Sequence, residues 1–181
     1  MSEELEVLTL VASRLDAVRI PYMVSGSTAI NVYAEPRMTR DIDIVVALQT
    51  GDIDTMATLF ADDFYCDRDM IQQAVARQGM FNVIHTATVI KVDFIVRKDT
   101  PYRRVEFERR RPITVDGQTI WVVSPEDLVL SKLAWAKPSH SEVQLRDVRN
   151  LIACAADLDW PYVERWAKDL TVSELLAQVR T

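Results

Sequence analysis

Three aspartates lie in two segments whose residue types alternate as in β-strands, and this arrangement suggests metal chemistry. Asp41 and Asp43 alternate with Ile42 and Ile44, so both carboxylates point to one face of a strand. Asp93 lies in a second alternating segment. Like charges side by side on a mostly buried strand repel each other and lose hydration, which raises their pKa values unless a cation offsets this cost. A hard divalent metal ion is the usual cation at such carboxylates.

A Gly-Ser pair precedes the two aspartates. Gly26 allows a sharp turn or a close approach of the backbone to a ligand, and Ser27 stands where a helix over Thr28 to Ala34 can begin. Helix N-termini present free N–H groups and a positive dipole end, which suit phosphate. The pair alone is explained equally well by a plain turn. Together with a carboxylate pair within 18 residues, it indicates a nucleotide with its Mg²⁺.

Length and composition place the chain in a broad class. A chain of 181 residues with 49% hydrophobic residues fits one domain, or a domain with a small helical appendage. The net charge of −6 argues against a protein that coats nucleic acid nonspecifically. Cys66 and Cys154 form no CxxC pair, and we interpret them as buried free thiols in a reducing cytoplasm. No apolar run approaches the roughly 20 residues that span a bilayer, so no membrane is expected.

The spacing of apolar residues predicts the elements that position these side chains. Helical spacing predicts a first helix from Leu5 to Val18. Asp116-Gly117 predicts a hairpin turn, and Ser124 predicts the start of a helical C-terminal region. The predicted strands are residues 22–24, 42–48, 81–85, 88–96, 112–115 and 118–123.

One segment of this acidic protein is basic. Residues 97–111 hold seven basic side chains against three acidic ones. Such a run is usually a solvated face or a set of partners for surface acids. The alternative is a contact with RNA phosphates through its arginines, which are Arg103, Arg104, Arg109, Arg110 and Arg111.

The histidines and tryptophans suggest no further chemistry. His85 and His140 have no metal-ligand spacing with either cysteine, so both are expected to be structural. The tryptophans are expected to anchor the core rather than to stack on bases. They are Trp121, Trp135, Trp160 and Trp166.

The motifs resemble those of a known superfamily. Gly26-Ser27, followed after 13 residues by Asp41 and Asp43, with Asp93 on a later strand, resembles the signature of polymerase-beta-like nucleotidyltransferases. Residues 124–152 are similar to a segment of abortive-infection (type IV toxin–antitoxin) toxin nucleotidyltransferases. The resemblance implies an α+β nucleotidyltransferase-type fold with a mixed sheet flanked by helices and a short C-terminal helical bundle. It divides the chain into a core over residues 1–123 and a helical region over 124–181 packed on it.

The resemblance also implies roles for individual residues. The nucleotide would be bound by Gly26, Ser27, Arg40 and Lys132. Two Mg²⁺ ions would be held by Asp41, Asp43 and Asp93, and Asp93 would also help to deprotonate the acceptor hydroxyl. Lys132 and Asp147 match the later motifs and would complete the catalytic site. From spacing alone, Lys132 rises from an apolar helix face, so it must either reach water or meet an anion.

These interpretations lead to an expected function. The chain is expected to move a nucleoside monophosphate from an NTP to an acceptor hydroxyl, with Mg²⁺ as cofactor and pyrophosphate as product. An RNA or tRNA end, a protein hydroxyl and a small molecule such as an antibiotic stay open as acceptors, and the basic segment favours RNA. A role in toxin–antitoxin or phage-defence systems would add a cognate antitoxin as partner. The alternative is a non-catalytic nucleotide-binding or interaction module, against which the third carboxylate argues.

Overall fold

The computed structural model describes residues 2–36, 39, 41–155 and 157–180. Within these residues the strands are β1 (Tyr22–Val24), β2 (Asp41–Val46), β3 (Phe64–Tyr65), β4 (Met80–His85), β5 (Lys91–Val96), β6 (Arg111–Val115) and β7 (Gln118–Val122). They form one seven-stranded sheet in the order β3-β4-β5-β2-β1-β7-β6. Because β2 is antiparallel to β1 and parallel to β5, the sheet is mixed, and the predicted α+β class is confirmed.

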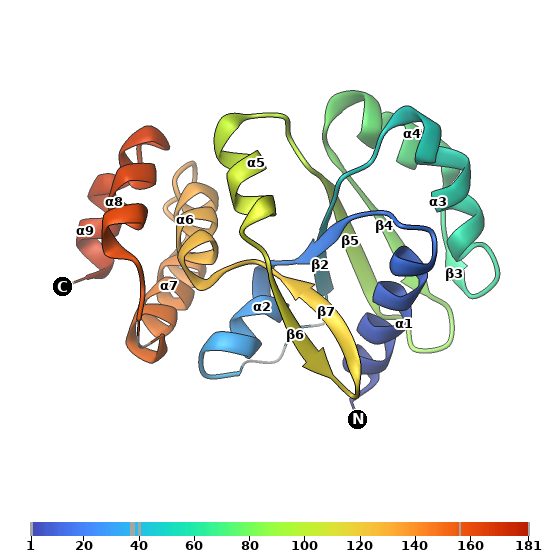
Figure 1. Ribbon diagram of the computed structural model, residues 1–181, viewed down its shortest axis with the longest axis horizontal. Helices are drawn as coiled ribbons and strands as arrows, with labels where there is room; N and C mark the ends of the chain where they lie inside the picture. The colour runs from blue at the N-terminus through green and yellow to red at the C-terminus, as the bar shows by residue number, and fades with distance from the viewer. Residues whose placement is uncertain (1, 37–38, 40, 156, 181) are drawn as a thin grey trace.

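Helices surround this sheet (Figure 1). In the described residues they are α1 (Glu3–Ala17), α2 (Gly26–Tyr33), α3 (Ile53–Phe60), α4 (Arg68–Arg77), α5 (Pro101–Glu108), α6 (Pro125–Ala136), α7 (Glu142–Cys154), α8 (Trp160–Asp169) and α9 (Ser173–Val179), with a 3-10 turn at Thr50–Asp52. Figure 1 shows α3 and α4 at one end of the molecule and α6 to α9 at the other. Helix α6 packs the C-terminal helices against the rest of the chain, because it contacts α2 as well as α7 and α8.

The two faces of the central strands differ as their alternation predicts. Ile44 of β2 and Phe94 of β5 are fully buried on the apolar face. The Phe94 ring packs against Phe60 of α3 and Phe81 of β4, with centroid distances of 5.5 and 5.1 Å. This packing makes one face of the sheet the core and leaves the aspartates on the other face.

Two elements were not predicted, and one prediction was misplaced. The short β3 and helix α5 were missed; in α5 the buried Tyr102 and Phe107 stand among arginines that hide the apolar spacing. The strand predicted over residues 88–96 begins instead at Lys91, because residues 86–88 form a turn. Helix α5 begins with Pro101 in its first turn, a position that favours proline.

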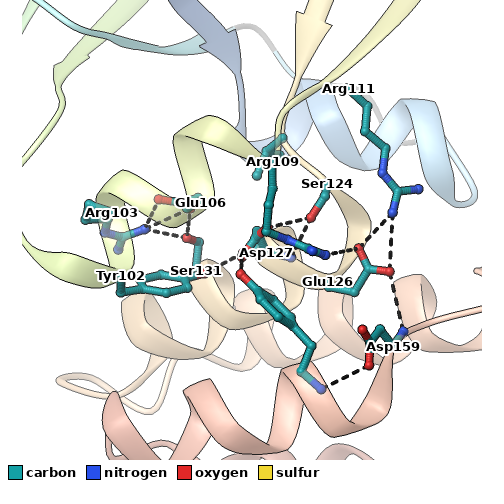
Figure 2. A network of polar contacts seen from close by, with 12 residues as sticks. Tyr102, Arg103, Glu106, Arg109, Arg111, Ser124, Glu126, Asp127, Ser131 and Asp159 are labelled. Carbon is teal, nitrogen blue, oxygen red and sulfur yellow. Dashed lines mark hydrogen bonds and ion pairs between the residues drawn. The ribbon is translucent and has the colours of Figure 1, made fainter.

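The basic segment binds acids of the same chain (Figure 2). Arg103 donates to Glu106 at 2.7 Å and to the Ser131 hydroxyl at 2.5 Å. Burial raises the pKa of Glu106, although the Arg103 guanidinium acts in the opposite direction. Glu106 is 2% exposed, so this contact fixes α5 on α6 away from water.

A second group of arginines binds the acidic first turn of α6. Arg109 Nε donates to Asp127 Oδ2 at 3.1 Å, and Arg111 lies 3.1 Å from Glu126. Asp127 is fully buried and also accepts a hydrogen bond of 2.6 Å from the Tyr162 hydroxyl of α8. These contacts join the C-terminal end of α5 and the start of β6 to α6, and α6 to α8.

The arginine cluster is therefore mainly a structural network. Four of its five guanidinium groups have carboxylate partners within the chain, since Arg104 also pairs with Asp99. The fifth, Arg110, lies over the Phe107 ring at 4.5 Å. Of the two interpretations that the sequence left open, the structure favours partners for acids over a surface for RNA.

Two other expectations were wrong. Trp135 is not a core anchor, because 56% of its surface is exposed on α6. The thiols are not both buried, since Cys154 is exposed and Cys66 is half-buried.

In the part of the chain that the structure describes, no helix has the length and apolar character needed to cross a membrane.

Candidate active site

The register of the sheet brings the predicted carboxylates together. Asp43 of β2 and Asp93 of β5 are direct partners on neighbouring parallel strands, so their side chains share one face. Asp41 lies two residues before Asp43 on the same face, opposite Lys91. Asp93 is 8% exposed, whereas Asp41 is exposed. The exposure of the three carboxylates thus decreases from Asp41 through Asp43 to Asp93.

Lys91 lies between two of these carboxylates. Its Nζ is 2.8 Å from Asp93 Oδ2 and 3.4 Å from Asp41 Oδ2. The hydrogen bond with Asp93 raises the pKa of Lys91, against the opposing effect of burial. The sequence analysis missed this residue, although its position two residues before Asp93 already placed it on the same strand face. Lys91 is a cation supplied by the chain itself at the place where a metal ion was predicted.

Ionisation of the Asp43 carboxyl group is unfavourable in the folded protein. Burial is the main reason that its pKa is raised, and the charge of Asp93 adds to the effect. A hydrogen bond from the Ser27 backbone N–H and the charge of Lys132 lower the pKa but do not cancel the rise. An additional cation at Asp43 would therefore be stabilised strongly.

Gly26 makes room for the Asp43 carboxylate. Its φ is +59°, a left-handed conformation that glycine adopts without strain. A Cβ atom at this position would lie 1.9 Å from Asp43 Oδ2. Both backbone geometry and the close approach of Asp43 thus require glycine, which the sequence signature alone did not explain.

We expect Gly26→Ala to lose about 1 to 3 kcal/mol of unfolding free energy, because the alanine would be strained and would push Asp43 aside. Urea denaturation measures this loss. The matched control is Gly51→Ala, where an added Cβ meets no atom within 4 Å. Equal stability of the two variants would show that the close approach at Gly26 is not a constraint.

Lys132 and Asp147 form a buried ion pair between α6 and α7. Lys132 Nζ lies 2.8 Å from Asp147 Oδ2 and donates to Gln144 Oε1 at 3.0 Å. Lys132 and Asp147 are 4% and 3% exposed. Helix α6 is buried almost all round, so its lysine cannot extend to bulk water and instead meets an anion.

Some of these groups line one cavity, whereas Asp41, Lys91, Asp93 and Asp147 are not among its described lining residues. The cavity has a volume of about 210 Å³, and its lining includes Gly26, Ser27, Asp43, Lys132, Trp135 and Gln144. The turn between β1 and α2, strand β2 and helices α6 and α7 each contribute to it. Arg40, expected to bind the nucleotide, lies outside the described residues.

The carboxylates suit a hard metal ion only after a local rearrangement. Among the described residues, no group of three or more His, Cys, Asp or Glu side chains is arranged to hold a metal. Asp43 and Asp93 are nevertheless paired oxygen donors on neighbouring strands, and burial raises the pKa of Asp43, so a cation beside it would favour the charged carboxylate. Asp41 can join them if Lys91 moves away from it.

The comparisons with known proteins agree with this geometry. Residues 2–179 match the family described as nucleotidyltransferase of unknown function (DUF6036). No curated protein matches the sequence.

Solved structures share the fold at low sequence identity. An antigenic nucleotidyltransferase-like protein from Paracoccidioides brasiliensis superposes with a TM-score of 0.63 at 19% identity, covering 99% of this chain and 93% of its own. A lincomycin-bound lincosamide antibiotic adenylyltransferase superposes with a TM-score of 0.55 at 13% identity; the match covers 86% of this chain and 99% of that protein. ANT(2″)-Ia in complex with adenylyl-2″-tobramycin gives 0.51 at 12% identity, covering 99% and 98%. These likenesses establish a nucleotidyltransferase fold.

Proposed function

Because the chain belongs to the DUF6036 nucleotidyltransferase family, we propose that it moves a nucleoside monophosphate from an NTP to an acceptor hydroxyl and releases pyrophosphate. One observation carries the proposal. A single cavity is lined by the Gly26-Ser27 turn, the Asp43 carboxylate and the Lys132 ammonium group. A phosphate cradle, an acid and a buried cation are the groups that such a transfer uses.

The donor triphosphate would lie over the N-terminus of α2. Gly26 and Ser27 begin that helix, whose positive dipole end favours an anion. Lys132 adds a positive charge to the lining of the same cavity. Asp147 would keep the Lys132 side chain in place rather than touch the nucleotide, because Asp147 is not among the described lining residues of the cavity.

Asp43 and Asp93, joined by Asp41, would hold the divalent ion. A metal ion bound there would activate the acceptor hydroxyl and stabilise the leaving oxygen. Asp93 would also take the proton of the acceptor hydroxyl; this role is supported by the strand register, which pairs Asp93 with Asp43. Lys91 competes with the ion for two of these three carboxylates.

We therefore expect Lys91→Met to bind Mn²⁺ more tightly than the wild type does. Without metal the variant should lose about 1 to 3 kcal/mol of stability, because the Asp93 carboxylate stays buried without its ammonium partner. Mn²⁺ titration followed by electron paramagnetic resonance gives the affinity, and urea denaturation gives the stability. Lys168→Met, at an exposed position of α8, is the control. Mn²⁺ affinity equal to or below that of the wild type would exclude competition by Lys91.

The acceptor could be one of several kinds of molecule, and the support for each kind differs. Two fold neighbours are described with an antibiotic or an adenylylated antibiotic bound. An RNA or tRNA end no longer has support from the arginine cluster, whose side chains bind acids of the chain. A toxin–antitoxin role rests only on the resemblance of residues 124–152.

The second candidate is a nucleotide-binding module without catalysis. Incubation of the purified protein with each α-labelled NTP, Mg²⁺ and cell fractions of RNA, protein and small molecules separates the two. Transfer of label to one fraction supports the enzyme. A thermal shift with NTP and Mg²⁺, worth about 2.7 kcal/mol at 100 times the dissociation constant, but no transfer to any fraction supports the module. No shift with any NTP contradicts both.

A further inference from the structure

A second cavity lies beside the first one. It has a volume of about 290 Å³ and shares four lining residues with the first cavity, which are Ser25, Ile95, Ser131 and Trp135. Its described lining includes none of the three strand aspartates and neither residue of the Gly26-Ser27 pair. It is therefore a second cavity that shares part of its wall with the proposed donor site.

The strands place this compartment next to the carboxylates. Val45 and Ile95 line it, and each follows an aspartate, Asp43 or Asp93, on the same strand face. Two residues along a strand correspond to about 6.6 Å. A ligand in the second cavity can thus end beside Asp93, where an acceptor hydroxyl has to be.

The charge of the second cavity is positive. Arg97, Lys98 and Arg103 line it, and among its described lining residues the one acid is Glu106. Glu106 is bound to Arg103 at 2.7 Å, which leaves the other two cations without a carboxylate in the described lining of the cavity.

Arg97 in particular is incompletely satisfied. Its Nε is buried and has no hydrogen-bond partner among the described residues, while its guanidinium carbon lies 5.4 Å from the centre of the Phe107 ring. The nearby Asp99 is paired with Arg104 at 2.5 Å. A buried donor without a partner is costly, so an anionic ligand at Arg97 would be favoured.

Trp135 stands where the two cavities meet. It lines both, and 56% of its surface is exposed although it belongs to an otherwise buried helix. An exposed indole beside cations is the combination that binds nucleotides, since bases stack on aromatic rings and phosphates bind cations. A polycationic aminoglycoside such as the tobramycin of a fold neighbour would instead meet like charges here.

We infer that the second cavity is the acceptor site and that the acceptor is a nucleotide moiety, with its base on Trp135 and its phosphate at Arg97 and Lys98. This inference rests on the proposed function. The acceptor hydroxyl oxygen forms a bond to the α-phosphorus of the NTP, and its proton passes to the Asp93 carboxylate. The bond from the α-phosphorus to the oxygen that bridges to the β-phosphorus breaks, and pyrophosphate leaves with that electron pair.

The test measures acceptor binding with the donor site filled. An α,β-methylene analogue of the NTP that gives the largest thermal shift is added at saturation with Mg²⁺. The protein is then titrated with a nucleoside monophosphate, with a short single-stranded oligoribonucleotide, and with tobramycin, followed by tryptophan fluorescence and calorimetry. Binding of both nucleotide probes identifies a single nucleotide moiety as sufficient, and binding of the oligoribonucleotide alone identifies an RNA end.

Three variants assign the binding to the cavity. Trp135→Ala is expected to weaken nucleotide binding about tenfold or more. Arg97→Gln combined with Lys98→Gln should weaken it and reduce the salt dependence by roughly 0.7 in log–log slope for each phosphate that is no longer bound. Arg77→Gln combined with Lys168→Gln, at exposed positions of α4 and α8, also removes two positive charges and is the charge-matched control, which should change neither quantity. The thermal shift with NTP and Mg²⁺ should be unchanged in the variant of Arg97 and Lys98 and in the control. Trp135 also lines the donor cavity, so its variant is judged on acceptor binding alone.

Each other result overturns the inference in a recognisable way. Tobramycin binding that exceeds nucleotide binding, or nucleotide binding that the cavity variants leave intact, excludes the assignment. Loss of the NTP shift in the variant of Arg97 and Lys98 would place the donor in this cavity, because neither residue is in the described lining of the first cavity. A wild type that shows an NTP shift but no nucleotide binding refutes the acceptor inference alone, whereas a wild type with no NTP shift refutes the proposed function itself.

Discussion

Asp43→Asn is expected to reduce nucleotidyl transfer by about 10³-fold or more and to leave the metal-free protein at least as stable as the wild type. Asparagine keeps the shape of the side chain but removes the charge that would bind the metal ion. Burial, with the added charge of Asp93, raises the pKa of Asp43, so the ionised carboxylate destabilises the fold at neutral pH. Single-turnover transfer of α-label and urea denaturation measure the two effects.

The pH dependence gives this prediction a second measurement. A carboxyl group whose folded pKa is raised stabilises the fold relatively more when it is protonated, and this contribution is lost as the pH rises through the folded pKa. The stability advantage of Asp43→Asn should therefore be present at neutral pH and should disappear below the unfolded pKa of aspartate. Asp62→Asn, at an exposed position, is the control and should change neither rate nor stability. Transfer at the wild-type rate by a folded Asp43→Asn would remove Asp43 from the site.

Lys132→Ala is expected to reduce transfer by about 10²-fold or more, because it removes a positive charge from the wall of the donor cavity. It should also destabilise the protein by about 3 to 5 kcal/mol, since Asp147 would stay buried without this ammonium group. Lys132→Arg should restore little activity, because a planar guanidinium does not replace a compact ammonium group. The rates are measured by single-turnover transfer.

A double variant separates the two roles of Lys132. Lys132→Met with Asp147→Leu removes both buried charges, and its stability should lie close to that of the wild type. Its transfer rate should stay as low as that of Lys132→Ala if the ammonium group acts on the donor. A wild-type rate in this double variant would mean that Lys132 has only a structural role.

Local periodicity predicted the parts of the site that follow from one segment at a time. Alternation around Asp41 and Asp43 placed both carboxylates on one face, and the register with β5 indeed puts Asp93 opposite Asp43. The same alternation applied to the second strand would have found Lys91, which the search for acids alone overlooked. Strands β2 and β4 lie close to their predicted positions because their buried residues alternate with exposed or half-buried ones.

Features that depend on contacts between distant segments could not be predicted. Arg103, Arg109 and Arg111 have partners on α6. Arg103 and Ser131, for example, lie 28 residues apart in the sequence. No local pattern distinguishes such pairs from a solvated basic face. The exposure of Trp135 is similarly set by the two cavities on either side of it rather than by its apolar helical neighbours.

Nucleotidyl transfer itself is tested most directly by comparing α-labelled and γ-labelled NTP in one reaction with an acceptor fraction. The account predicts that the wild type attaches the α-label covalently to the acceptor and releases the γ-label as pyrophosphate, and that Asp43→Asn does neither. Attachment of the γ-label would indicate a kinase reaction and contradict the account. Release of the γ-label as inorganic phosphate, with no label on any acceptor, would indicate NTP hydrolysis and would also contradict nucleotidyl transfer.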